Sequence, residues 1–174
     1  SKEGILCEDK TIIKLIISGK EDVVKKILKG VLHTRTLKIN ENYLTLKTIE
    51  NDKKLFWKDI MLFSTFSPVV ETTKTDDNQK QYLSPYEPSY YENLGKNLKR
   101  KYKLIYGKEY EGDLFFDIDN ELEIKNKKIK MKKGLLVGYN FDVWIEADKD
   151  MQKVAYYLGL GQNSSTGLGC LNFV

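Results

Sequence analysis

The closing segment of the chain, residues 135–174, reads LLVGYNFDVWIEADKDMQKVAYYLGLGQNSSTGLGCLNFV. Apolar side chains alternate over Leu135–Glu146, which predicts one extended strand. Asp148 then predicts the N-cap of a short helix, and Gly159 is placed to end it. After a glycine-rich loop, Cys170–Val174 predicts a final short strand. The segment therefore predicts the closing β-α-β half of a mixed fold.

The stretch before it supplies the opening half. Residues 55–72, LFWKDIMLFSTFSPVVET, are rich in aromatic and β-branched side chains and contain a proline, which favours an extended strand with an irregularity over a helix. Residues 73–88 carry the turn chemistry of a surface loop. Ser89 followed by Glu92 predicts a capping box, which opens a helix that runs to about residue 105.

Two more strands are predicted between that helix and the closing segment, at residues 113–119 and 122–131. From Leu55 onward the order of elements is therefore βαββαβ, which is the ferredoxin-like arrangement of the α+β class. We assign residues 53–174 to one such domain. In its sheet, the first strand of the motif should lie between the third and the fourth.

The first third of the chain predicts part of a second unit. Apolar side chains recur at helical spacing over residues 20–32, and Ser18 with Glu21 predicts a capping box at the start of this helix. Strands are predicted on both sides of the helix. They cover residues 4–8, 11–17 and 36–49, the last with a bulge around residues 40–42.

The order ββαβ over residues 1–52 is a ferredoxin-like unit without its opening strand and helix. That strand would lie inside the sheet, where its absence leaves unpaired backbone groups on both sides. The sequence also begins with Ser1 rather than Met. We therefore expect a tandem of two ferredoxin-like folds, with one strand and one helix preceding Ser1 in the intact protein.

Composition narrows the class of protein. The 174 residues are 41% hydrophobic and 31% charged, which is enough for a real core, and no apolar run is long enough to span a membrane. We expect a soluble cytoplasmic protein. Cys7 and Cys170 lie far apart without CxxC or metal-ligand spacing, so they are predicted to be reduced thiols. With His33 as the single histidine, we expect no metal and no cofactor.

Positive charge is concentrated in two windows, residues 96–108 and 125–133, each of which carries six basic and no acidic side chains. Outside the two windows the chain has 17 of its 29 basic side chains and all 25 acidic side chains, which gives a net charge of −8. An acidic body with concentrated basic elements suits a polyanion bound in one place. The alternative is a pair of solvated lysine faces.

Helical spacing in the first window places four cations on one face: Lys96, Lys99, Arg100 and Lys103. In the second window Lys127, Lys128 and Lys130 are predicted on a neighbouring strand or hairpin, where they could follow the same polyanion. Tyrosines at 82, 86, 90 and 91 could stack on bases, although half-buried tyrosines are commoner at such positions.

The loop GLGQNSSTGLG, residues 159–169, has Gly-x-Gly at both ends. A dinucleotide fingerprint needs a third glycine where Ser164 stands and a helix afterwards, and a Walker loop needs Gly-Lys-Ser/Thr, so both are excluded. Glycines and a row of hydroxyls suit the close approach of a phosphate backbone. The loop could also be no more than a tight connection. The loop residues predicted to bind RNA are Gly159, Gly161, Ser164, Ser165, Thr166, Gly167 and Gly169.

This double Gly-x-Gly, between a short helix and a last strand, resembles the signature loop of the Cas-six family of RAMP proteins, the CRISPR-associated endoribonucleases that process repeat RNA. Other stretches resemble the family in the same order: FSTFSPVV at 63–70, ENLGKNLKRKY at 92–102 and VGYNFDVWIEA at 137–147. Two departures stand out. Family loops usually carry a basic residue where QNSST has none, and the family's catalytic residues lie in the opening strand-helix section.

The resemblance implies metal-independent cleavage of a CRISPR repeat RNA, in which the 2′-hydroxyl attacks the adjacent phosphate and leaves a cyclic phosphate and a 5′-hydroxyl. It allows other Cas proteins and a second copy of the chain as partners. His33 does not match the family's catalytic position and is interpreted as a residue at a helix C-terminus. We therefore assign no catalytic residue.

Two alternatives remain. One is a non-catalytic RNA-binding subunit of a CRISPR ribonucleoprotein. The other, a generic protein with two RNA-recognition motifs, is weakened because no motif such as Lys-Gly-Phe-Gly-Phe-Val is present.

Overall fold

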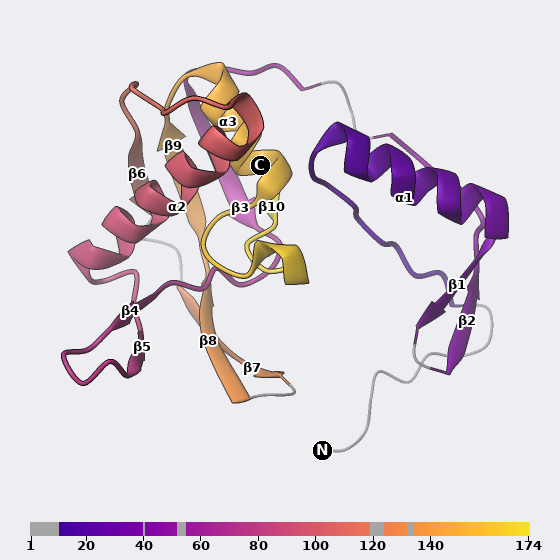
Figure 1. The fold of residues 1–174 in the computed structure, drawn as a ribbon, viewed down its shortest axis with the longest axis horizontal. Helices are drawn as coiled ribbons and strands as arrows, with labels where there is room; N and C mark the ends of the chain where they lie inside the picture. The colour runs from indigo at the N-terminus through magenta and orange to yellow at the C-terminus, as the bar shows by residue number, and fades with distance from the viewer. Residues whose placement is uncertain (1–10, 40, 52–54, 119–123, 132–133) are drawn as a thin grey trace.

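The computed structural model describes residues 11–39, 41–51, 55–118, 124–131 and 134–174. Its centre is a four-stranded antiparallel sheet in the order β10-β3-β9-β6 (Figure 1). The strands are β3 (Ile60–Thr65), β6 (Phe115–Ile118), β9 (Asp142–Glu146) and β10 (Leu171–Phe173). The first strand of the motif, β3, lies between the third and the fourth, as a ferredoxin-like sheet requires. The predicted α+β class and βαββαβ order are confirmed.

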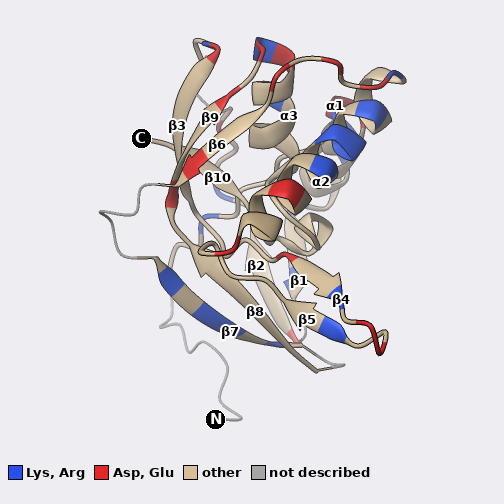
Figure 2. Ribbon diagram, turned by 90° about the vertical axis from the view of Figure 1, so that its left-hand side faces the viewer, with Lys and Arg blue, Asp and Glu red and all other residues tan. Residues whose placement is uncertain are grey.

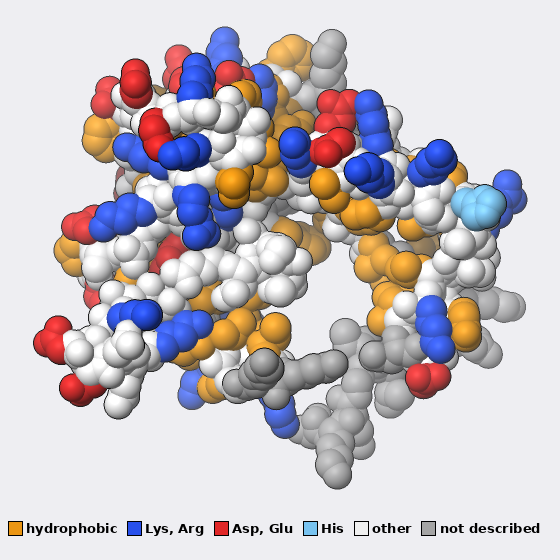
Figure 3. Space-filling model, viewed as in Figure 1, with side chains coloured by type: hydrophobic (Ala, Val, Ile, Leu, Met, Phe, Trp, Pro, Cys, Tyr) orange, Lys and Arg blue, Asp and Glu red, His pale blue; other side chains and the backbone are white. Residues whose placement is uncertain are grey.

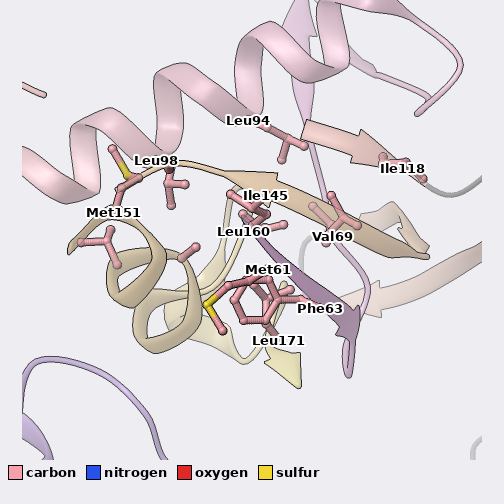
Figure 4. Packing of buried hydrophobic residues seen from close by; sticks show 14 of the residues in the cluster. Met61, Phe63, Val69, Leu94, Leu98, Ile118, Ile145, Met151, Leu160 and Leu171 are labelled. Atoms are coloured by element: carbon pink, nitrogen blue, oxygen red, sulfur yellow. The ribbon is translucent and has the colours of Figure 1, made fainter. Parts of the chain in front are cut away.

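Two helices cover one face of this sheet, α2 (Pro88–Tyr106) and α3 (Lys149–Leu158). Because side chains alternate along a strand, every second residue of β3 and β9 points to the helices, and Phe63 and Ile145 are fully buried. Leu94 of α2 and Met151 of α3 belong to the same buried cluster (Figure 4). The core therefore lies between the helices and the sheet.

The N-cap of α3 is confirmed. A carboxylate oxygen of Asp148 accepts hydrogen bonds from the backbone N–H groups of Asp150, at 3.0 Å, and Met151, at 2.8 Å. These bonds satisfy amides that have no partner inside the helix. Gly159 follows the helix with a positive φ of 73°, also as predicted.

The capping box predicted at the start of α2 is wrong. The helix begins at Pro88, and Glu87 is the N-cap residue without a side-chain capping bond. Proline is well suited to the first helical position because its φ is already helical and its missing N–H is not needed there. Ser89 consequently lies inside the first turn, and Glu92 forms an exposed ion pair with Lys96.

The single strand predicted over 135–146 is divided at Phe141 into β8 (Gly134–Asn140) and β9. The Thr65 side chain occupies the break: its hydroxyl donates to the Phe141 carbonyl at 3.0 Å and accepts from the Phe141 N–H at 2.8 Å. Beyond the break β8 leaves the central sheet and pairs with β7 (Lys125–Met131) as a two-stranded ribbon.

A hairpin also stands where we predicted a surface loop. It consists of β4 (Thr72–Lys74) and β5 (Lys80–Tyr82), which pair antiparallel. The Tyr82 hydroxyl donates to the Leu135 carbonyl at 2.7 Å and so attaches this hairpin to β8.

The first third holds α1 (Glu21–Thr34), β1 (Thr36–Ile39) and β2 (Asn42–Thr45). The strand predicted at 4–8 and the bulge position Asn40 lie outside the described residues. The strand predicted at 11–17 is wrong, because that segment has no strand pairing. The predicted extended run over 36–49 is instead a hairpin in which β1 and β2 pair antiparallel.

The capping box at Ser18 is wrong as well, since Lys20 is the N-cap of α1 and makes no side-chain capping bond. None of the residues of α1 is buried. The boundary between residues 52 and 53 stays a prediction.

Candidate nucleic-acid interface

Three positions of the loop accept only glycine, because neighbouring backbone atoms leave no space for a Cβ. Gly159, Gly161 and Gly169 are buried and have positive φ. A Cβ at Gly169 would lie 1.8 Å from the Leu160 carbonyl oxygen, and one at Gly161 would lie 2.8 Å from that of Val70. No L side chain fits such positions, so these glycines pack the loop onto the core and leave no room for a phosphate at their own backbone.

Backbone hydrogen bonds hold the loop in place. Its two Gly-x-Gly ends are joined by the Leu160 N–H, which donates to the Gly169 carbonyl at 2.8 Å. The Gly169 N–H donates to the Pro68 carbonyl at 3.0 Å, and the Gln162 N–H donates to the Val70 carbonyl at 2.8 Å. The loop is thus fixed along the segment that follows β3.

The tip of the loop is the part open to a ligand. Ser165, Thr166 and Gly167 are exposed, Ser164 is half-buried, and a Cβ at Gly167 would meet open space. The Thr166 hydroxyl donates to the Asn163 carbonyl at 2.7 Å, which uses its hydrogen. Contact between the loop and a phosphate backbone therefore stays a prediction for the tip alone.

A buried lysine joins α2 to the loop. The Lys101 ammonium donates to the carbonyl oxygens of Gly159, at 2.8 Å, and Gly161, at 2.9 Å, and the residue is only 7% exposed. Burial lowers its pKa to about 8, against the opposing field of Glu71. The predicted site does not include Lys101, although the spacing of this residue from Asn97 and Leu98 places it on the buried side of the helix.

Glu71 is the acidic partner beneath the loop and is 1% exposed. One carboxylate oxygen, Oε2, accepts from the Gln162 side-chain amide at 3.0 Å. Burial raises the pKa of Glu71 to about 7, while the hydrogen bond from Gln162 and the charge of Lys101 act in the opposite direction. No local pattern in the sequence indicates this pair, because Glu71 ends an apolar run that is typical of an ordinary strand.

Beside this pair lies a polar cavity of about 240 Å³ between α2, β4 and the loop. Its lining residues are Glu71, Thr72, Asn93, Lys96, Asn97, Arg100 and Gln162. Two of the four predicted cations, Lys96 and Arg100, therefore share a surface with the glycine loop. Figure 3 shows basic side chains gathered over α2 beside the mostly uncharged surface of the loop.

The other two predicted cations point elsewhere. Lys103 forms an ion pair with Glu109, and the Lys99 ammonium lies 5.9 Å from the centroid of the Tyr110 ring. Both contact the segment that follows α2 rather than the cavity. The predicted cationic face is thus divided into two pairs of side chains.

The lysines of β7 are exposed but are not close to α2 (Figures 1 and 2). In the pleated strand Lys128 and Lys130 share one side, and Lys127 lies on the other. The hairpin predicted to carry them is present, whereas a continuous surface with the cations of α2 is not formed in this structure.

Of the tyrosines considered for base stacking, Tyr90 is excluded because it is fully buried against Tyr139 and Phe141. Tyr86 is exposed. His33 lies in the last turn of α1, as interpreted from the sequence.

Cys170 is a free thiol, and Cys7 lies outside the described residues. Within the described part of the chain, no group of three or more metal-binding side chains is suited to a metal ion, and no helix is both long and apolar enough to cross a bilayer.

Similarity to known proteins agrees with this architecture. Residues 49–173 match the family model described as CRISPR associated protein Cas6, C-terminal. A CRISPR-associated endoribonuclease Cas6 of Methanocaldococcus jannaschii is 28% identical over 176 residues, which cover 97% of this chain and 66% of the relative. The chain thus spans just under two thirds of that protein's length.

Solved structures show the same fold. A Cas6-related protein from Pyrococcus furiosus superposes with a TM-score of 0.79 at 22% identity, covering 91% of this chain and 65% of that one. A RAMP protein described as binding different RNA substrates gives a TM-score of 0.77 at 21% identity, with 91% and 66% covered. Because the family model matches most of the sequence and ends with the glycine loop and β10, this chain belongs to the Cas6 family.

Proposed function

We propose that this protein binds CRISPR repeat RNA and takes part in the metal-independent endonucleolytic cleavage of that RNA. The observation that carries the proposal is the junction of α2 with the glycine loop, where Lys96 and Arg100 border a polar cavity and Lys101 fixes the loop beneath them. Such a surface offers charge for phosphates and polar groups for bases. The relative from Methanocaldococcus jannaschii, named an endoribonuclease, supports the same activity.

The cleavage step is the one that the family resemblance implies. The 2′-hydroxyl loses its proton to a general base and attacks the adjacent phosphorus, and the 5′-oxygen leaves with a proton from a general acid. Cations stabilise the charge that builds on the phosphate during this step. We assign RNA binding to α2 and the loop, and we assign the base and the acid to no described residue.

The test is to incubate the full-length gene product with its own repeat RNA in excess EDTA. We expect cleavage at one site, giving a cyclic phosphate and a 5′-hydroxyl, since no step requires a divalent ion. Cleavage that stops on chelation and returns with magnesium would contradict the metal-independent reaction. Failure to bind the repeat RNA would contradict the whole proposal.

A second candidate is an RNA-binding subunit that does not cut, within a complex with other Cas proteins or with a second copy of the chain. It is favoured by the position of the single histidine, His33, which is exposed at the end of α1 and away from α2. Tight binding of the repeat without any product in the same experiment would select this candidate.

A further inference from the structure

Two buried oxygen atoms beside the cavity have no hydrogen-bond partner among the described residues. They are Oε1 of Glu71 and Oδ1 of Asn97, and the two residues are 1% and 9% exposed. An acceptor that is buried without a partner loses its bonds to water and gains none in return, which is unfavourable. Both residues line the cavity, so a ligand seated there could supply the missing donors.

The side-chain amides of Gln162 and Asn93 in the cavity wall are already engaged in hydrogen bonds. The Gln162 amide donates to Glu71 Oε2 and to the Thr72 carbonyl, and its oxygen accepts from the Thr72 hydroxyl at 2.9 Å. The Asn93 amide donates to the Thr72 carbonyl at 3.3 Å. Among the groups that line the cavity, Glu71 Oε1 and Asn97 Oδ1 are thus buried acceptors left without a partner.

Cations lie at the outer edge of the same cavity. Lys96 and Arg100 are exposed, and both line the cavity. A ligand that satisfies both the unpartnered acceptors and the cations has N–H donors at one end and a phosphate at the other. A nucleotide whose base carries an exocyclic amino group has this pattern, whereas the Watson–Crick edge of uracil presents a carbonyl in place of the amino group.

We propose that the cavity is a nucleotide subsite that takes one unpaired, amino-bearing base of the bound RNA, with its amino group on Glu71 and Asn97 and its phosphate on Lys96 and Arg100. The proposal rests on the proposed function and names a specificity of the same surface. Entry of the base requires the Glu71 and Asn97 side chains to turn toward the cavity.

The comparison that tests it uses nucleoside 5′-monophosphates that differ in the amino group: CMP against UMP, and GMP against IMP. Binding is followed by NMR titration of the isotope-labelled protein, with shift changes required at the Asn97 and Gln162 side-chain amides. We expect CMP and GMP to bind at least about fivefold more tightly than UMP and IMP, the discrimination that a good base-edge contact provides.

Glu71→Gln is the decisive variant. The Gln162 amide is held by Thr72 and donates to Oε2, so the oxygen of the new amide must face Gln162 and its NH₂ group takes the place of Oε1. This replaces an acceptor with a donor at the cavity. The preference for CMP over UMP should fall to about one or reverse, because uracil presents a carbonyl there.

Glu146→Gln is the matched control, since it removes an exposed carboxylate on the sheet and should leave the CMP preference unchanged. Asn97→Leu provides an independent variant and should also reduce the preference. Equal binding of CMP and UMP to the wild type, or an unchanged preference in Glu71→Gln, would overturn the proposal.

The same measurements separate this inference from the proposed function. If the full-length protein binds its repeat RNA but shows no amino-dependent preference, the subsite is refuted and the RNA function stands. If the CMP preference and its response to Glu71→Gln are present but repeat RNA is not bound, the RNA function is refuted and a nucleotide site remains.

Discussion

At the scale of single residues, the chemistry of the junction between α2 and the loop depends on one buried pair. Lys101 donates to two loop carbonyls, and Glu71 accepts from Gln162 of the same loop. Because burial disfavours the charged form of each group, their pKa values move toward one another, to about 8 for Lys101 and about 7 for Glu71. Stability should therefore depend on pH near neutrality.

We expect the free energy of unfolding to fall as the pH rises from 5 to 7.5. The pKa of Glu71 is about 7 in the folded protein and near its ordinary value of 4.5 in the unfolded chain, so the folded protein binds one more proton between these values. The stabilisation that this extra proton provides is complete at low pH and is lost as the pH rises through the folded pKa. The free energy of unfolding should change by about 1–3 kcal/mol. Urea denaturation at both pH values measures it.

Glu71→Gln should show a smaller fall in stability over that pH range, because the variant has no carboxyl group at this position. Glu146→Gln, at an exposed site, should keep the wild-type fall. An identical pH dependence in wild type and Glu71→Gln would show that this carboxyl group does not titrate in the expected range.

At the scale of secondary structure, substitutions at two glycines of the loop, Gly169 and Gly167, should differ in how much they destabilise the protein. Gly169→Ala should destabilise the protein by about 3 kcal/mol or more, because its Cβ would collide with the Leu160 carbonyl. Gly167→Ala meets open space and should cost only about 1 kcal/mol for the positive φ. Thermal or urea denaturation compares them, and equal losses would contradict the packing role of Gly169.

The division of the cations on α2 makes a second prediction. Replacing Lys96 and Arg100 with Gln should weaken binding of repeat RNA by about tenfold at physiological salt, because two phosphate contacts are removed. The same change at Lys99 and Lys103, which alters the net charge equally, should weaken it by less than about threefold. Filter binding or fluorescence anisotropy measures both. A larger effect from the second pair would place the RNA on the opposite side of the helix.

What the sequence could predict at this scale depended on how local the signal was. Asp148 as an N-cap and Gly159 as a terminator act within one helical turn, and both predictions are confirmed. Ser89 matched a capping box equally well, but the adjacent Pro88 sets the start of α2 two residues earlier, with Glu87 as the N-cap. The pairing of Glu71 with Gln162 joins residues about ninety positions apart, so no local pattern could reveal it.

At the scale of the whole molecule, the two basic windows of the sequence occupy separate places, α2 and the β7–β8 hairpin (Figure 2). If single-stranded RNA neutralises about six of them, the logarithm of the binding constant should fall with the logarithm of salt concentration at a slope of roughly −4. A slope near zero would refute binding through these cations.

The hairpin contribution can be separated with two variants. Because Lys128 and Lys130 share one side of β7, replacing both with Gln should reduce the slope by about 1.4 if that side faces the RNA, and Lys127→Gln should then change nothing. A smaller slope in Lys127→Gln alone would instead place the Lys127 side of β7 against the RNA. No change in either variant would leave the RNA on α2 and the loop alone.

The central sheet has a consequence for how the protein reaches its folded state. Both hydrogen-bonding partners of β3, the strands β9 and β10, come from the last fifth of the sequence. Until those residues are available, β3 has neither neighbour, and its apolar side chains have no sheet to join. Long-range pairings of this kind slow folding, so this domain should acquire its structure late and cooperatively.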